Sequence, residues 1–101
     1  MLNITKTLEN GALTIALAGE LNTFTSQELK KVIDESIDSA SSVTFDLENL
    51  EYISSAGLRL FLTTQQTMDE RALPTVAVKN ASAVILETFA ITSFNNVLEV
   101  L

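Results

Sequence analysis

The chain has 101 residues and a net charge of −7, with no cysteine and no histidine. This length fits one domain, which we place at residues 1–101. Without cysteine or histidine, disulfides, zinc–thiolate sites and the commonest general base are excluded, so we predict no catalytic residue, cofactor or metal. The acidic balance argues against nucleic-acid binding. No stretch approaches a membrane span and no N-terminal signal is visible, which predicts a cytoplasmic protein.

The first part of the chain is typical of a β-hairpin. Residues 2–8 alternate apolar and polar side chains, which predicts an edge strand with Leu8 as a further candidate for its inner side. Asn10-Gly11 supplies the positive φ angles of a tight turn. Residues 12–18 are nearly all apolar, which predicts a more central strand that pairs antiparallel with the first.

A helix is predicted after this hairpin. Thr25 and Glu28 have the spacing of a capping box, and Phe24 and Leu29 have that of a hydrophobic staple. The predicted buried stripe consists of Leu29, Val32, Ile33 and Ile37. A following strand at residues 43–47 would complete a βαβ unit.

Residues 43–62 are the most informative stretch of the chain. After the strand, a short acidic loop leads to Leu50, Tyr52 and Ile53, which we expect to return to the core. The helical pattern starts at Leu58 and continues to Arg71 or Ala72. Its apolar face would contain Leu58, Phe61, Leu62 and Met68, with Gln65 interrupting it and Ala72 extending it.

Ser54-Ser55-Ala56-Gly57 stands between this strand and this helix. A serine there has an ordinary structural role as a helix N-cap. The same position also suits a phosphoserine, because the first backbone N–H groups of a helix lack internal partners and the helix dipole favours negative charge. The residues alone leave both interpretations open.

The last part of the chain predicts two more strands and one more helix. Pro74 ends the preceding helix, and residues 75–79 form a short apolar strand. Ser82 is the predicted N-cap of a helix that buries Ile85, Leu86 and Phe89. Residues 97–101 form the final strand.

The ordered motifs resemble the STAS domain family, in particular the bacterial anti-sigma factor antagonists. The resemblance rests on five motifs in this order: Gly-Glu-Leu at 19–21, the capped helix, the strand with Asp-Leu, Ser-Ser-Ala-Gly-Leu at 54–58, and the helix with Phe89. The resemblance implies an α/β fold with a mixed sheet of four to five strands and about three helices packed largely on one side. Asn22 stands where the family has aspartate, and Ser93 where it has a turn glycine.

The resemblance also implies a function, which is partner switching. The antagonist would bind an anti-sigma factor that is itself a serine kinase of the GHKL ATPase type. Phosphorylation, at Ser55 or as second choice at Ser54, would release it, and a PP2C-type phosphatase would restore it. The implied partner-binding residues are Glu20, Asn22, Thr23, Ser54, Ser55, Ala56, Gly57, Arg59 and Leu60. The C-terminal helix common in the family is absent, so part of the sheet is expected to be open or used for pairing, and a homodimer is possible.

Three other functions compete with partner switching. Some STAS domains are accessory subunits of lipid- or anion-transport systems and act as non-phosphorylated binding modules. A non-switching module with Ser55 as a simple cap is the second alternative. An enzyme built on acids such as Asp46, Glu48, Glu51 and Glu20 is the third and weakest, because no phosphate loop or general base accompanies them.

Overall fold

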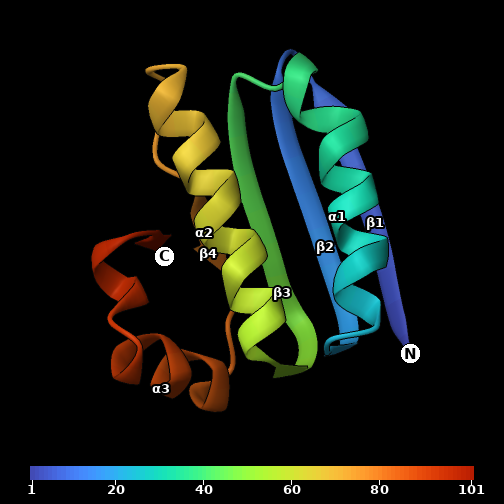
Figure 1. The fold of residues 1–101 in the computed structure, drawn as a ribbon, viewed down its shortest axis with the longest axis vertical. Helices are drawn as coiled ribbons and strands as arrows, with labels where there is room; N and C mark the ends of the chain where they lie inside the picture. Colours follow the sequence, from blue (N-terminus) through green and yellow to red (C-terminus); the bar gives the residue numbers. More distant parts are fainter.

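The computed structural model describes residues 1–101 and shows a mixed five-stranded sheet in the order β1-β2-β3-β4-β5 (Figure 1). The strands are β1 (Leu2–Glu9), β2 (Ala12–Leu21), β3 (Ser42–Ile53), β4 (Ala77–Lys79) and β5 (Glu99–Val100). The helices are α1 (Thr25–Ser36), α2 (Ser55–Glu70) and α3 (Ala83–Ile91), with 3₁₀ turns at Ile37–Ser39 and Phe94–Asn96. Only the β1–β2 pair is antiparallel. The predicted α/β architecture is confirmed.

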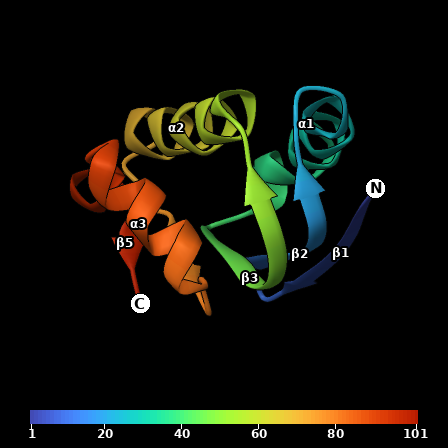
Figure 2. The ribbon, with the colours of Figure 1, turned by 90° about the horizontal axis from the view of Figure 1, so that it is seen from below.

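The helices lie largely on one side of the sheet, as predicted. Figure 2 shows α1 and α2 side by side over β1, β2 and β3, with α3 beyond α2 toward β5. The opposite face of β1, β2 and β3 has no helix over it. Its side chains are small or polar, including Thr5, Thr14, Ala16 and Thr44, which are exposed or only half-buried. Such residues tolerate contact with water, so the face needs no cover.

A row of aromatic rings connects the helices to the sheet. Phe45 of β3 stacks on Phe61 of α2 with ring centroids 4.4 Å apart. Phe61 lies 6.4 Å from Phe89 of α3, and Phe89 lies 6.3 Å from Phe94. Aromatic pairs at these distances add to the hydrophobic stabilisation of the core. The row therefore fixes α2 and α3 relative to β3.

The β1–β2 hairpin forms around the predicted turn. Asn10 and Gly11 have φ angles of 52° and 86°, which a two-residue turn of this kind requires. Both strands are longer than predicted: β1 continues to Glu9, which pairs with Ala12, and β2 continues to Leu21, which pairs with Ile53 of β3. Leu8 lies on the same side of β1 as Leu2 and Ile4, as predicted, but its side chain is 45% exposed.

β3 runs unbroken to the start of α2, so the predicted acidic loop is wrong. Its pairing with β2 shifts register twice. Ala16 and Ala18 of β2 are two residues apart, but they pair with Asp46 and Asn49 of β3, which are three apart. A second shift follows the pair of Gly19 with Leu50. Each shift is a β-bulge with one extra residue in β3. The bulges change the burial period from two to three, so Leu47, Leu50 and Ile53 are buried. Tyr52 does not return to the core and is 50% exposed.

The start of α1 differs from the prediction. The side chain of Thr25 does not cap the helix; instead Asn22 Oδ1 accepts hydrogen bonds from the N–H groups of Phe24 and Thr25, both at 2.9 Å. The capping box is therefore wrong. The hydrophobic staple is wrong too, since Phe24 is 82% exposed while Leu29 is buried. The predicted stripe holds, with Leu29, Ile33 and Ile37 buried and Val32 half-buried.

The structure of α2 and α3 also corrects the predictions for single residues. α2 starts at Ser55, before the predicted Leu58, and ends at Glu70, so Ala72 is an exposed residue outside it with a φ angle of 55°. Gln65 does not interrupt the buried face but belongs to it, at 4% exposed. Leu86 of α3 is exposed, against the prediction. Two predictions are confirmed: Ser82 caps α3, and Ile85 and Phe89 are buried.

Candidate functional site

The predicted site residues come together where β2 and β3 end. These strands are parallel, so their carboxyl ends lie at the same edge of the sheet. Leu21 pairs with Ile53, and the N–H of Ser54 donates to the carbonyl of Leu21 at 2.8 Å. The chain after β2, leading into α1, therefore lies beside the start of α2. We call this end of the molecule the switch end and define it by residues 20–24 and 52–59.

The two adjacent serines have different surroundings. Ser54 is the N-cap of α2: its Oγ accepts the N–H of Gly57 at 3.3 Å, and the residue is half-buried. Ser55 is the first residue of the helix and is exposed. Its hydroxyl makes no hydrogen bond within the domain. Of the two serines, only Ser55 thus offers a free hydroxyl to another molecule at the start of α2.

Gly57 contacts the domain's own core and is buried. A Cβ atom built on Gly57 would lie 2.7 Å from Cγ and Cδ2 of Leu21 and 3.0 Å from Cγ1 of Ile53. The surface that lies against Gly57 is that of Leu21, so Gly57 positions the start of α2 against β2. Its role in partner binding stays a prediction.

Asn22 stabilises the local structure of the switch end through hydrogen bonds. Besides capping α1, its backbone N–H donates to Thr25 Oγ1 at 2.8 Å. The Thr25 hydroxyl in turn donates to the carbonyl of Glu20, also at 2.8 Å. These bonds make a rigid turn out of residues 20–25. The oxygen atom that an aspartate would supply at position 22 is present in asparagine, without its charge.

The remaining predicted residues divide by exposure. Glu20, Thr23 and Arg59 are exposed, and Ala56 is half-buried. Arg59 has no ion-pair partner, since both ion pairs of the chain involve other residues. Leu60 is half-buried and packs against the core cluster, facing α1, so its expected projection away from the core is wrong.

Two exposed aromatic residues at the switch end were not predicted. Phe24 stands at the entry to α1, and Tyr52 stands one residue before the end of β3. The sequence carried a signal for Phe24: asparagine is a preferred N-cap, and with Asn22 as the cap Phe24 no longer precedes the cap as a staple residue must. No comparable signal marks Tyr52, because the bulges of β3 decide its direction.

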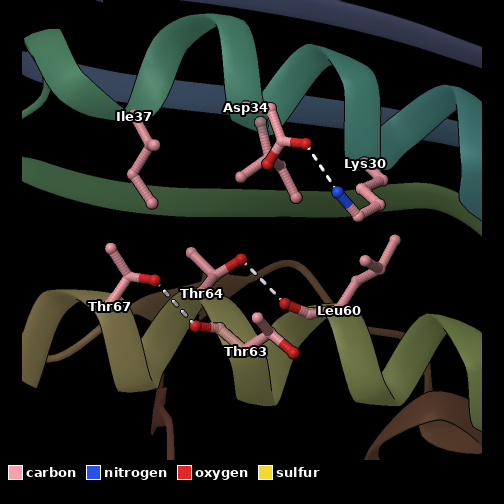
Figure 3. Close-up of a pocket in the computed structure, with 8 residues that line it drawn as sticks. Lys30, Asp34, Ile37, Leu60, Thr63, Thr64 and Thr67 are labelled. Atoms are coloured by element: carbon pink, nitrogen blue, oxygen red, sulfur yellow. Dashed lines mark hydrogen bonds and ion pairs between the residues drawn. The ribbon is translucent and has the colours of Figure 1, made fainter.

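A shallow groove separates α1 from α2 (Figure 3). Its volume of about 90 Å³ is below the several hundred Å³ of ordinary small-molecule sites. Its threonine hydroxyls are engaged, Thr64 donating to the carbonyl of Leu60 at 2.7 Å and Thr67 to that of Thr63 at 3.1 Å. The groove is lined by Lys30, Ile33, Asp34, Ile37, Leu60, Thr63, Thr64 and Thr67. Its lining offers no free charged group, because Lys30 pairs with Asp34 at 2.7 Å.

The acids considered for catalysis do not form a common site. Asp46 Oδ1 accepts from Asn80 Nδ2 at 3.0 Å and from the N–H of Glu48 at 3.2 Å, in the middle of the sheet. No group of three or more acids gathers as a metal site would require. None of the helices has the length and apolar character needed to cross a membrane.

Comparisons with known proteins agree with this geometry. No curated protein matches the sequence. Among solved structures, an anti-sigma factor antagonist from Mycobacterium paratuberculosis is 17% identical, with 99% of this chain and 85% of that chain covered and a TM-score of 0.82. The antagonist SpoIIAA in its unphosphorylated form is 17% identical, with 98% and 88% covered and a TM-score of 0.85. The phosphorylated form of SpoIIAA, from Bacillus, is also 17% identical, with 98% and 91% covered and a TM-score of 0.78. These likenesses show a shared fold.

The sequence match is more specific than the fold. The sequence pattern of the STAS domain matches residues 3–100, which is nearly the whole chain. The chain therefore belongs to the STAS domain family.

Proposed function

We propose that this single STAS domain, residues 1–101, is a cytoplasmic anti-sigma factor antagonist that works by partner switching. It binds an anti-sigma factor that is also a serine kinase of the GHKL type, which frees the sigma factor for transcription. The kinase then phosphorylates Ser55 and the complex separates. A PP2C-type phosphatase returns the domain to its binding form. The domain acts by binding and carries out no catalysis of its own.

The observation that carries this proposal is the contrast between the two serines. A kinase needs a hydroxyl that is exposed and not already bonded, and Ser55 has one. Ser54 is committed to capping α2. The solved phosphorylated form of SpoIIAA supports the idea that this fold tolerates the modification.

Electrostatics explain how a phosphate on Ser55 would release the partner. It adds about −1.5 to −2 charges at pH 7. The first N–H groups of α2 stabilise this charge while the domain is free. In a complex the charge must lose part of its water and lies on the same end as the carboxylate of Glu20. A penalty of about 1.4 kcal/mol lowers the affinity tenfold, so a few kcal/mol suffice.

The fold survives this switch because Ser55 supports none of it. Its hydroxyl has no internal partner, so adding a phosphoryl group breaks no hydrogen bond of the domain. The modification thus changes the charge of the switch end and leaves the core unchanged.

The test is the intact mass of the chain after incubation with ATP and the GHKL kinase encoded nearest its gene. We expect a gain of one phosphoryl group, lost in Ser55→Ala and kept in Ser54→Ala, which is the matched control. The Ser55→Asp variant should bind this kinase at least tenfold more weakly than the unmodified chain.

Other outcomes decide between the alternatives. A gain that survives in Ser55→Ala would move the site to Ser54. Tight binding without phosphoryl transfer would leave a non-switching binding module. If the chain neither binds the kinase nor accepts a phosphoryl group, the proposal is contradicted. An accessory subunit of a lipid- or anion-transport system is then favoured.

A further inference from the structure

The outer edge of β1 carries backbone groups without partners. β1 is an eight-residue strand at the end of the sheet and pairs with β2 alone. Glu9 and Ala12 flank the Asn10-Gly11 turn, and the pair that flanks a two-residue turn is hydrogen-bonded. Hydrogen-bonded residues alternate along an antiparallel strand. Odd-numbered residues of β1 therefore bond to β2, and the N–H and C=O groups of Leu2, Ile4, Lys6 and Leu8 face outward.

A hydrogen bond at the start of the strand agrees with this alternation. The carbonyl of Met1, another odd-numbered residue, accepts the N–H of Glu20 in β2 at 3.4 Å. The free edge thus presents four successive even-numbered residues in regular geometry.

None of the usual devices protects this edge. Proteins commonly block an edge strand with a proline, a bulge or a charged side chain. β1 contains no proline, and its pairing with β2 has no register shift over all eight pairs. Its one lysine does not guard the edge, because Lys6 Nζ donates to Ser36 Oγ of α1 at 3.0 Å.

The side chains of β1 suit a second copy of the same strand. On the helix side, Leu8 is 45% exposed and Ile4 half-buried, so both leave apolar surface at the edge. On the open face, Asn3, Thr5 and Thr7 are exposed. The strand holds one lysine and one glutamate and is neutral, in a chain of net charge −7. Because this strand is neutral, two copies can meet along it without the repulsion that an acidic surface would add.

We propose that two copies of this chain pair antiparallel through β1, about a two-fold axis at Thr5, and join their sheets into one. Thr5 then faces Thr5 of the second copy, Leu8 faces Leu2, and Lys6 faces Ile4. Each hydrogen-bonded pair uses the outward groups of even-numbered residues. The proposal goes beyond partner switching and does not depend on it.

Other registers are less favourable. A shift by one residue would place the helix side of one copy against the open face of the other. An axis at Lys6 would set two lysines directly opposite each other, which costs stability. An axis at Ile4 would shorten the paired stretch. Ser55 and the start of α2 stay accessible in the chosen arrangement, because β1 is separated from β3 and α2 by β2 (Figure 1).

The absence of cysteine from the chain makes a cross-linking test specific. Thr5 would be a non-hydrogen-bonded pair with itself, with Cα atoms about 4.5 Å apart, which a disulfide spans. We expect oxidised Thr5→Cys to run on a non-reducing gel at twice the 11.0 kDa of one chain. Thr7→Cys is the matched control: it faces Asn3 and should stay a single chain, whereas a mixture of Thr7→Cys and Asn3→Cys should cross-link.

A second measurement needs no cross-link. Sedimentation equilibrium should show the unmodified chain at twice the mass of one chain, and Thr5→Lys should weaken this association at least tenfold. Thr7→Lys should weaken it much less, and the unfolding temperature of both variants shows that they fold. A monomer at all concentrations would overturn the proposal and leave the edge to another kind of partner. Cross-linking of Thr7→Cys alone as fast as Thr5→Cys, or unchanged association of Thr5→Lys, would also overturn it.

Discussion

At the scale of single residues, Gly57 shows how the core determines the switch end. The small space between α2 and β2 is filled by Leu21, which is fully buried. We expect Gly57→Ala to destabilise the domain by about 1 kcal/mol or more, because overpacking costs about 1–3 kcal/mol and exceeds the gain from alanine's helix propensity. Urea unfolding measures this change.

The matched control for this substitution removes the obstacle. In a Leu21→Ala background only Ile53 Cγ1, 3.0 Å away, still limits the added methyl group, so Gly57→Ala should there destabilise the domain much less. Equal destabilisation in both backgrounds would show that the effect of Gly57→Ala comes from the helix backbone and not from contact with Leu21.

Residues at the switch end also show why part of the site was not predictable. Thr25 and Glu28 fit a capping box, yet Asn22 caps α1, since both are acceptable N-terminal signals in sequence. With Thr25 as the N-cap, the sequence predicts Phe24 to be buried in a hydrophobic staple. With Asn22 as the N-cap, Phe24 is predicted to be exposed. One hydrogen-bond acceptor therefore decides whether an aromatic residue belongs to the core or to the surface next to Ser55.

At the scale of elements, Gln65 connects α2 to the strand that follows. Its Oε1 accepts the buried N–H of Val76 at 2.6 Å, and its Nε2 donates to Asp69 at 2.7 Å. We expect Gln65→Leu to destabilise the domain by about 1–3 kcal/mol, because the Val76 N–H would be left buried without a partner. The loss exceeds what the added apolar surface returns. Thermal unfolding measures it.

Gln65→Glu provides the comparison, since it keeps an acceptor for Val76. It should lose less stability than Gln65→Leu at a pH where the carboxyl is partly protonated. A Gln65→Leu variant as stable as the unmodified chain would show that water reaches Val76 and that the hydrogen bond is dispensable.

β3 is the element that sequence periodicity described least well. A strand is recognised by alternation, and the bulges after Asp46 and Leu50 replace alternation with a period of three. The same bulges aim Tyr52 outward. Regular stretches such as α1 and the β1–β2 hairpin were predictable because one periodicity holds along each, whereas β3 changes its periodicity within one strand.

At the scale of the whole molecule, the fold was predictable because local signals and family motifs agree. The Asn-Gly turn, the caps and the apolar strands set the order of elements, and the STAS motifs set the topology. The position of Ser55 between β3 and α2 followed from this order. Its freedom from hydrogen bonds did not, because that depends on which of two adjacent serines accepts the N–H of Gly57.

The net charge of −7 gives a prediction for the proposed dimer as a whole. At about 0.01 M salt the screening length is about 30 Å, close to the 31 Å longest extent of the domain, so the charges of two copies repel across the entire pair. At about 0.1 M this length falls to about 10 Å. Dimers held by β1 backbone bonds and Leu8 should therefore become several-fold tighter as salt rises, as sedimentation equilibrium can measure. Weaker association with salt would mean that ion pairs, not the neutral β1 edge, hold the copies together.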